Sequence, residues 1–196
     1  MNNLRPDLAI IAGHVTTGAR VLDVGCGDGT LLAVLRDEQG CNVHGMEIDA
    51  ENVAECVAKG LSVIQGDADR DLVFYPDDTF DYAILSLTLQ TTMRPDRVLE
   101  ELLRVGRRAF VSFPNFAHWR VRLSLLWGGR MPVTRLLPAA WYETPDIHHV
   151  TIADFLAFVA QRGIKVERAW FLSGGKRIGA VAANFRAEHA VFLISR

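Results

Sequence analysis

Short apolar runs alternate along the chain with longer segments in which apolar residues recur every three or four positions. The short runs predict buried strands at 21–24, 41–46, 61–65, 80–85, 107–113, 164–172 and 190–195. The periodic segments predict helices that begin near Pro6 and at Thr30, and further helices over 49–59, 95–105 and 152–161. This alternation predicts an α/β fold with a mostly parallel seven-stranded sheet and helices on both faces.

Two connecting segments interrupt the alternation. Residues 115–150, after the fifth predicted strand, are far longer than an ordinary connection and predict a helical insertion. Its apolar residues recur at helical spacing at Phe116, Trp119, Leu123, Leu126 and Trp127. This stripe by itself favours a helix packed on its own sheet, whereas the tryptophans and arginines of the whole run favour a lid or a partner-docking segment. Residues 173–188, with three glycines, predict a mobile loop.

The junction of the first strand and its helix carries a glycine loop, RVLDVGCGDGTLL over Arg20–Leu32. Its glycines are Gly25, Gly27 and Gly29. They permit a sharp bend and let a ligand approach unpaired main-chain amides. A dinucleotide fingerprint would have its third glycine at Thr30, and Asp23 would repel a pyrophosphate, so NAD is disfavoured. The pattern resembles the first motif of class I S-adenosylmethionine (SAM)-dependent methyltransferases.

Composition and charge limit the class of protein. The 196 residues, 49% hydrophobic and 22% charged, indicate one globular domain over 1–196. With no apolar run of roughly 18 residues and no export signal, we expect no membrane association and a cytoplasmic location. Three widely spaced cysteines without a CxxC pattern disfavour a zinc site, and no metal is expected. The net charge is −10 over 1–93 and +8 over 94–196, yet no basic run suggests nucleic acid.

Four residues at predicted strand ends are candidates for cofactor binding, each with an alternative. Glu47, about 20 residues past the glycine loop, can accept hydrogen bonds from ribose hydroxyls, or it is a surface acid. Ile48 can pack on an adenine or belong to the core. Asp67 can meet the adenine amino group or stabilise a turn. Cys26 lies inside the loop, where a small filler is favoured over a nucleophile.

A methyl acceptor would lie near the segment Ser86-Leu87-Thr88-Leu89-Gln90, which follows the fourth predicted strand. The segment lacks an Asn/Asp-Pro-Pro-Tyr motif, and although Gln90 or the hydroxyls can orient a substrate, none is an obvious base. His148 and His149 can supply an acid or base. With only Asp146 nearby in sequence, helix-entry or packing roles are favoured for both histidines.

The second half of the chain closely resembles the methionine-biosynthesis protein MetW family. The resemblance rests on RVGRRAFVSFPNFAHWRVRLSLLWGGRMPVT over Arg104–Thr134 and LPAAWYETPDIHHVTIADF over Leu137–Phe155, and it extends from about Arg20 to Leu172. The chain departs from the family pattern near Ala139 and Ala140, where an aromatic residue is more usual, and at Asp146, where Asn is.

This resemblance implies a Rossmann-like class I methyltransferase fold that binds SAM or S-adenosylhomocysteine. It also implies a role beside a homoserine O-acyltransferase in methionine synthesis. The cofactor set carried over by position is Asp23, Gly25, Gly27, Gly29, Glu47, Asp67 and Ala68, and Cys26, Ile48 and Leu87 complete the candidates.

Two functions follow as hypotheses. The favoured one is an accessory or regulatory subunit that binds SAM and docks on the acyltransferase. The alternative is an active SAM-dependent methyltransferase with a small-molecule acceptor under the insertion. A homodimer is compatible with both, and the sequence leaves open the acceptor and whether SAM activates or inhibits a partner.

Overall fold

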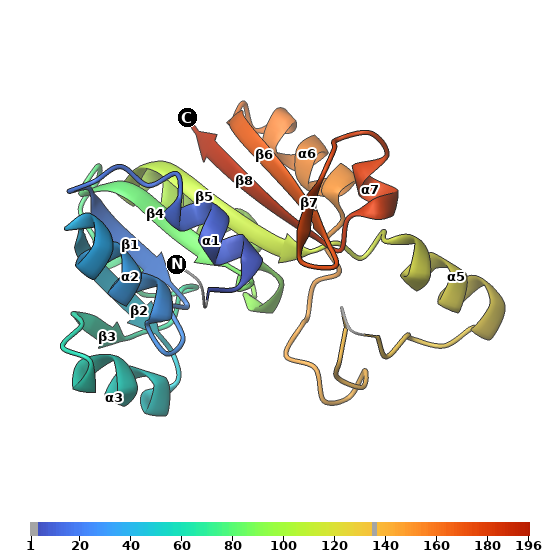
Figure 1. Ribbon diagram of the computed structural model, residues 1–196, viewed down its shortest axis with the longest axis horizontal. Helices are drawn as coiled ribbons and strands as arrows, with labels where there is room; N and C mark the ends of the chain where they lie inside the picture. The colour runs from blue at the N-terminus through green and yellow to red at the C-terminus, as the bar shows by residue number, and fades with distance from the viewer. Residues whose placement is uncertain (1–3, 135–136) are drawn as a thin grey trace.

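An eight-stranded sheet in the order β3-β2-β1-β4-β5-β8-β6-β7 forms the middle layer of the protein (Figure 1). This computed structural model describes residues 4–134 and 137–196. The strands are β1 (Arg20–Val24), β2 (Asn42–Glu47), β3 (Val63–Gln65), β4 (Phe80–Ser86), β5 (Gly106–Pro114), β6 (Lys165–Ser173), β7 (Lys176–Ile178) and β8 (His189–Ser195). β1 to β5 pair in parallel, whereas β8 is antiparallel to β5 and β6. The predicted α/β class and mostly parallel sheet are confirmed.

Helices cover both faces of this sheet, as predicted. The helices are α1 (Pro6–Ala12), α2 (Thr30–Gln39), α3 (Ala50–Ala58), α4 (Pro95–Val105), α5 (Trp119–Gly128), α6 (Ile152–Gln161) and α7 (Ala183–Arg186), with short 3-10 turns η1 (Leu72–Phe74) and η2 (Leu89–Thr91). α1, α2 and α3 contribute to one hydrophobic cluster, and α4, α6 and α7 contribute to the other.

The central strands are apolar throughout because both of their faces are buried. In β4, Ile84 belongs to the cluster under α1 and α2, whereas Leu85 belongs to the cluster under α4. Successive side chains of a strand point to opposite faces, so a run of apolar residues supplies both cores at once. The same run brings the carboxyl ends of β1, β2 and β4 to one edge of the sheet.

The segment 173–188 is not the predicted mobile loop, and the sheet has an eighth strand. β7 pairs antiparallel with β6 in the register Phe171↔Ile178 and Ser173↔Lys176. Gly174 and Gly175 both have positive φ, 56° and 75°. Two consecutive residues of this conformation form the type I′ turn that suits a tight hairpin. The glycines that suggested mobility therefore specify a two-residue turn, and α7 follows it.

The insertion also differs from one prediction. α5 forms where the apolar spacing predicted a helix, but it extends away from the sheet (Figure 1). Val121 is its only buried residue, and Leu126 and Trp127 are 75% and 78% exposed. A helix packed on its own sheet is therefore wrong here. Helical spacing shows that a face is apolar but does not show which surface covers that face.

Both ends of the insertion are fastened at one buried amide, that of Asn115. Its Nδ2 donates to the carbonyl oxygens of Asn184 and Ala187 at 3.0 and 2.8 Å. Its Oδ1 accepts from the amides of Ala117 and Ile152 at 3.2 and 3.3 Å. The start of the insertion is thereby tied to the beginning of α6.

Among the described residues, no helix is long and apolar enough to span a membrane.

Candidate functional site

A cavity of about 360 Å³ lies at the carboxyl ends of β1, β2 and β4. We call it the strand-end cavity. Its walls are Val24, Gly25, Met46, Glu47, Ile48, Gly66, Asp67, Ala68, Asp69, Thr88, Thr91, Thr92 and Pro145. Open α/β sheets bind ligands at this edge, where neighbouring connections leave on opposite faces. The structure thus brings together five of the candidates, Gly25, Glu47, Ile48, Asp67 and Ala68.

The glycine loop bends sharply between β1 and α2. Gly25, Gly27 and Gly29 have φ of 72°, 54° and 75°. A Cβ at Gly25 would lie 2.4 Å from Thr88 Oγ1, so the loop and the β4–η2 connection touch at a point where only glycine fits. At Gly27, by contrast, a Cβ would meet no atom within 4 Å. The loop is therefore packed at Gly25 and open at Gly27.

The expectation of unpaired amides in this loop is wrong at four positions. The amides of Gly25 and Cys26 donate to the Met46 carbonyl at 2.8 and 3.2 Å. The Gly29 amide donates to the Cys26 carbonyl at 3.1 Å. The Gly27 amide donates to Glu47 Oε2 at 2.8 Å. These bonds hold the loop against β2, so a ligand meets a preformed loop.

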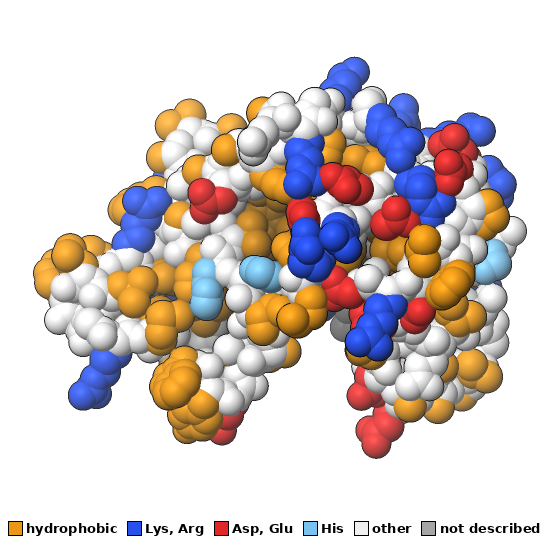
Figure 2. All heavy atoms as spheres, turned by 180° about the vertical axis from the view of Figure 1, so that it is seen from behind, with side chains coloured by type: hydrophobic (Ala, Val, Ile, Leu, Met, Phe, Trp, Pro, Cys, Tyr) orange, Lys and Arg blue, Asp and Glu red, His pale blue; other side chains and the backbone are white. Residues whose placement is uncertain are grey.

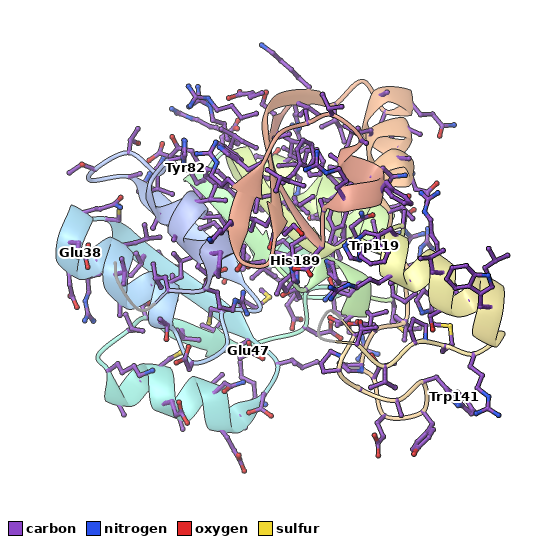
Figure 3. All side chains as sticks on the ribbon, turned by 45° about the vertical axis from the view of Figure 1, so that its right-hand side comes forward. Glu38, Glu47, Tyr82, Trp119, Trp141 and His189 are labelled. Atoms are coloured by element: carbon purple, nitrogen blue, oxygen red, sulfur yellow. The ribbon has the colours of Figure 1, made fainter. Side chains whose placement is uncertain are left out.

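Glu47 lies at the end of β2 (Figure 3), where it is buried and its carboxylate accepts hydrogen bonds from three backbone amides. Besides Gly27, the amides of Ile48 and Asp49 donate to Oε1 at 2.9 and 3.0 Å. A carboxylate has about four acceptor positions, so one of them, on Oε2, stays open toward further donors. Glu47 is thus no ordinary surface acid. It can accept a hydrogen bond from one ribose hydroxyl as it stands. It can accept one from a second hydroxyl only if one of its hydrogen bonds from a backbone amide is broken.

Asp23 lies beneath the glycine loop and does not line the strand-end cavity. The side chain is buried, and its Oδ1 has no hydrogen-bond partner. Burial raises the pKa of this carboxyl to about 7, against the opposing effect of the Arg5 guanidinium, and Glu47 and Asp7 add to the rise. An orphaned buried oxygen of this kind is a place for a hydrogen-bond donor of a ligand or of a water molecule.

The structure decides the alternatives that the sequence left open for Asp67 and Ile48. Asp67 Oδ1 accepts from the Asp69 amide at 2.9 Å, which is the predicted turn-stabilising bond, while the residue also lines the cavity. Ile48 is 65% exposed, so a core role for it is wrong. Asp69 was not predicted. It accepts from the amides of Met93 and Arg94 at 2.7 and 2.8 Å and fixes the start of α4 beside the cavity.

Cys26 and Leu87 lie outside this cavity. Cys26 is buried, and its sulfur fills the space beside Gly45, where an added Cβ would lie 2.8 Å from it. Burial raises the pKa of the Cys26 thiol well above its usual range, so the filler interpretation agrees with the structure better than a nucleophile. Leu87 has a strained φ of 54° and lines a separate cavity of about 160 Å³.

Beside the candidate Leu87, this second cavity contains charged and polar residues that the sequence did not mark. Its walls include Arg5, Asp7, Leu87, Glu188 and His189. Asp7 is buried and accepts from the hydroxyls of Ser86 and Ser112 at 2.8 and 3.2 Å. Burial lowers the pKa of His189, although Asp7 and Glu188 oppose the shift, so this imidazole is neutral at physiological pH.

The remaining candidates for acceptor chemistry occupy other places. Gln90 is buried, and its Nε2 donates to the Leu87 carbonyl at 2.7 Å, so it supports the turn after β4. His148 and His149 line a third cavity, of about 520 Å³, between η2, α4 and α6. His149 also packs against the Phe116 ring, with centroids 4.1 Å apart. Packing is therefore an observed role of His149.

The walls of the strand-end cavity fit a nucleoside with polar substituents. The open acceptor position of Glu47 suits a sugar hydroxyl, and Met46 and Ile48 offer apolar surface to a base. Asp67 and Asp69 offer further carboxylate oxygens. Residues 4–134 and 137–196 hold no group of three or more His, Cys, Asp or Glu side chains placed to bind a metal ion.

Sequence reasoning missed part of this site for identifiable reasons. Thr88, which lies in the segment named for a methyl acceptor, lines the cavity, but Thr91 and Pro145 were missed, because a threonine in a turn and a proline in a long insertion carry no specific signal. Asp7 carried no local sign of a site, because it lies at the start of the helix predicted near Pro6. Its approach to β4 and β5 depends on how α1 folds back over the sheet, which no local pattern encodes.

Similarity to known proteins agrees with this geometry. The family model "Methionine biosynthesis protein MetW" matches residues 5–194. The chain is 35% identical over 205 residues to the bifunctional methionine biosynthesis protein MetXA/MetW of Rhodopirellula baltica, covering 98% of this chain and 33% of that protein. It is 31% identical over 159 residues to the ubiquinone biosynthesis O-methyltransferase of Xylella fastidiosa, covering 77% of this chain and 63% of that enzyme.

A solved structure shows the same fold. The S-adenosylmethionine-dependent methyltransferase of Mesorhizobium loti superposes with a TM-score of 0.73 at 18% identity, covering 100% of this chain and 99% of that one. The expected Rossmann-like class I methyltransferase fold is therefore confirmed. Because the family model spans nearly all of the sequence, the chain belongs to the family of methionine biosynthesis protein MetW.

Proposed function

We propose that this protein is a SAM-binding accessory or regulatory subunit that acts with a homoserine O-acyltransferase in methionine biosynthesis. The observation that carries the proposal is the fusion named MetXA/MetW, in which a stretch similar to this chain makes up 33% of a larger bifunctional protein. Two activities joined in one chain are held at high effective concentration. Separate chains that serve the same step need a binding surface instead.

The strand-end cavity is the proposed cofactor site. Glu47 would hold the ribose, Met46 and Ile48 would lie against the adenine, and Asp67 would face its amino group. The glycine loop would lie along the methionyl part, near the orphaned oxygen of Asp23. SAM, when bound, supplies a methyl group on an electrophilic sulfonium, and S-adenosylhomocysteine fits the same contacts.

The distribution of titratable groups favours an accessory role. The cavity walls contain carboxylates but no histidine, lysine or tyrosine within the described residues. Its carboxylates are engaged with backbone amides, as the bonds of Glu47, Asp67 and Asp69 show. A methyl acceptor that must lose a proton therefore finds no uncommitted base at the cavity wall.

An active small-molecule methyltransferase is the second candidate, and one observation favours it. The second cavity adjoins Leu87 and contains His189, whose lowered pKa leaves a neutral imidazole. A neutral imidazole is a competent general base. Transfer of labelled methyl from SAM to a metabolite of a cell extract would establish this activity, and its absence despite SAM binding would exclude it for the metabolites present.

The proposal is tested with the purified protein and the homoserine O-acyltransferase of the same organism. Acyltransferase activity is measured with and without this protein, over a range of SAM concentrations. We expect activity to depend on the protein and to change with SAM. Activity that is identical in all mixtures would refute the accessory role.

The cofactor site is tested by calorimetry. Glu47→Ala removes the open acceptor position and the anchor of the Gly27 amide, so we expect SAM to bind at least about 10-fold more weakly. Glu55→Ala is the matched control, because Glu55 lies exposed on α3. Equal SAM affinity for the two variants would remove Glu47 from the site.

A further inference from the structure

The insertion exposes an apolar surface that nothing in the described chain covers. We call residues 116–134 and 137–147 the arm. Figure 2 shows hydrophobic side chains gathered on the lobe that protrudes from the molecule. The large exposed apolar side chains of the arm are Trp119, Leu125, Leu126, Trp127, Met131, Val133, Trp141, Tyr142 and Ile147. Trp141 and Tyr142 are 73% and 70% exposed, and Trp141 lies far from Glu47 (Figure 3).

Exposed tryptophans in such numbers are typical of a protein-binding surface. Tryptophan, tyrosine and arginine are enriched where binding energy concentrates, and a contiguous apolar patch is costly to leave in water. The arm owes its position to its base, where Asn115 and the bond from the Phe116 amide to the Val150 carbonyl, 3.0 Å, fasten it. The apolar surface is thus held away from the body of the protein instead of collapsing onto it.

Charge indicates what kind of surface fits the arm. The arm carries two acids, Glu143 and Asp146, at its inner end, whereas residues 115–142 contain no Asp or Glu. Arg120 lies over the Trp119 ring at 5.2 Å from its centroid, and Arg130 is exposed near the end of α5. A matching surface is therefore apolar with an acidic rim. A second copy of the arm fits poorly, because a two-fold interface would bring its arginines against their own kind.

The inner end of the arm reaches the strand-end cavity. Pro145 is a wall of the cavity, opposite residues of the glycine loop and of the β4–η2 connection. Two residues further on, the amides of Ile147 and His148 both donate to the Gln90 carbonyl, at 2.9 and 3.0 Å. Gln90 belongs to η2, and the cavity walls include Thr91 of η2 and the flanking Thr88 and Thr92. A ligand in the cavity therefore touches both the arm and the turn on which the arm rests.

We infer that the arm is the docking surface for the acyltransferase and that Pro145 and the Gln90 contacts couple its docking to occupancy of the strand-end cavity. This inference rests on the proposed function, since it names the surface and the regulation of that partnership. Coupling between two sites is reciprocal, so SAM must change the affinity for the partner by the factor by which the partner changes the affinity for SAM.

Docking is tested with two matched double variants of the full-length protein. Leu126→Ser with Trp127→Ser removes exposed apolar side chains of α5, and Val73→Ser with Phe74→Ser does the same at η1, outside the arm. All four side chains are exposed, so neither variant should impair folding. We expect the α5 variant to bind the acyltransferase at least about 10-fold more weakly than the wild type and to bind SAM with unchanged affinity. The η1 variant should bind both the acyltransferase and SAM with wild-type affinity.

Coupling is tested by measuring the partner affinity with and without SAM, and the SAM affinity with and without the partner. We expect equal factors of about 5-fold or more in the wild type. In Pro145→Gly, the factor by which SAM and the acyltransferase change each other's affinity should fall toward one. This variant should still bind SAM and the acyltransferase separately. A wild type that binds with no SAM dependence would overturn the coupling.

The outcomes separate the inference from the proposed function. If the wild type does not bind the acyltransferase, the proposed function fails and the docking surface with it. If the wild type binds and the α5 variant binds equally well, only the docking surface is refuted. Two other outcomes, each with unchanged acyltransferase binding, would assign the arm to a different occupant. If the wild type sediments as a homodimer and the α5 variant does not, the arm binds a second copy. If the wild type binds phosphatidylserine vesicles and the α5 variant does not, the arm binds a membrane.

Discussion

Two carboxylates at neighbouring strand ends show how much a residue's role depends on its partners. Glu47 accepts three backbone amides, whereas Asp23 is buried with an unpartnered Oδ1. Both face a glycine loop, and both are acids at the end of a buried strand. Glu47 organises the loop through hydrogen bonds from three amides, while the environment of Asp23 favours the neutral acid at pH values where an exposed aspartate is ionised.

The burial of Asp23 predicts a pH dependence of stability. The carboxyl has a pKa near 3.8 when unfolded and about 7 when folded. Its contribution to stability is thus complete below pH 3.8 and is lost as the pH rises through about 7. At about 1.4 kcal/mol per pKa unit, the free energy of unfolding of Asp23→Asn should rise by up to about 4 kcal/mol relative to that of the wild type between pH 4 and pH 8. Urea unfolding across this range measures the difference.

The control for this prediction is Glu55→Gln, which neutralises an exposed carboxylate on α3. Its stability relative to the wild type should stay nearly constant with pH. A constant difference for Asp23→Asn as well would show that Asp23 keeps its charge in the folded protein, with Arg5 outweighing its burial and the charges of Asp7 and Glu47.

Among the elements, the connections carry more of the function than the strands do. The β4–η2 connection touches Gly25 through Thr88, and η2 itself supports the arm through Gln90 and lines the cavity through Thr91. The end of β5 fastens the arm through Asn115. Because these joints are made by buried hydrogen bonds, the arm keeps its direction although α5 itself buries little.

The anchor at Asn115 predicts a loss of stability on truncation. Asn115→Ala removes four hydrogen bonds and leaves buried amides and carbonyls of the arm base, α6 and α7 without partners. We expect a loss of about 2–4 kcal/mol in the free energy of unfolding. Asn42→Ala, at an exposed position of β2, should stay within about 0.5 kcal/mol. Equal losses for both variants, measured by chemical denaturation, would refute the anchoring role.

At the scale of the whole molecule, charge and function divide along the sheet. Strands β1 to β4 form one half of the sheet and β5 to β8 the other (Figure 1). Residues 1–93, which contain β1 to β4, carry the excess of acids, and residues 94–196, which contain β5 to β8 and the arm, carry the excess of bases. The strand-end cavity lies in the acidic half, and Pro145 joins it to the arm. If the proposed function is correct, a positively charged sulfonium and an acidic partner surface would each be attracted to their own side of the molecule.

Cofactor binding predicts a stabilisation of the entire fold. A ligand that binds only the folded state, at 100 times its Kd, adds about 2.7 kcal/mol. For a domain of this size each kcal/mol raises the Tm by about 2–4 °C, so SAM should raise it by about 5–10 °C. Scanning calorimetry measures the shift. The Tm of Glu47→Ala should rise much less at the same SAM concentration. If SAM does not change the Tm of the wild type at any concentration, that result would argue against a SAM site.

Local patterns predicted most of the framework. Apolar runs located the strands to within one or two residues, and the order of strands and helices indicated the α/β class, because burial on both faces leaves a continuous apolar run. The hairpin of β6 and β7 was missed, since the pair Gly174-Gly175 encodes a tight turn and a mobile loop equally well. Which of the two forms depends on whether the following strand finds an edge to pair with.

For the site, the sequence by itself determined which chemical groups stand at the strand ends: the glycine loop, Glu47, Ile48 and Asp67 occupy positions that any parallel sheet brings to one edge. Only the tertiary structure decided how these groups are used. Hydrogen bonds of Glu47 to the loop, the burial of Asp23, the wall formed by Pro145 and the outward direction of α5 all arise from residues distant in sequence. Periodicity specifies which face of an element is apolar, but long-range packing determines what that face meets.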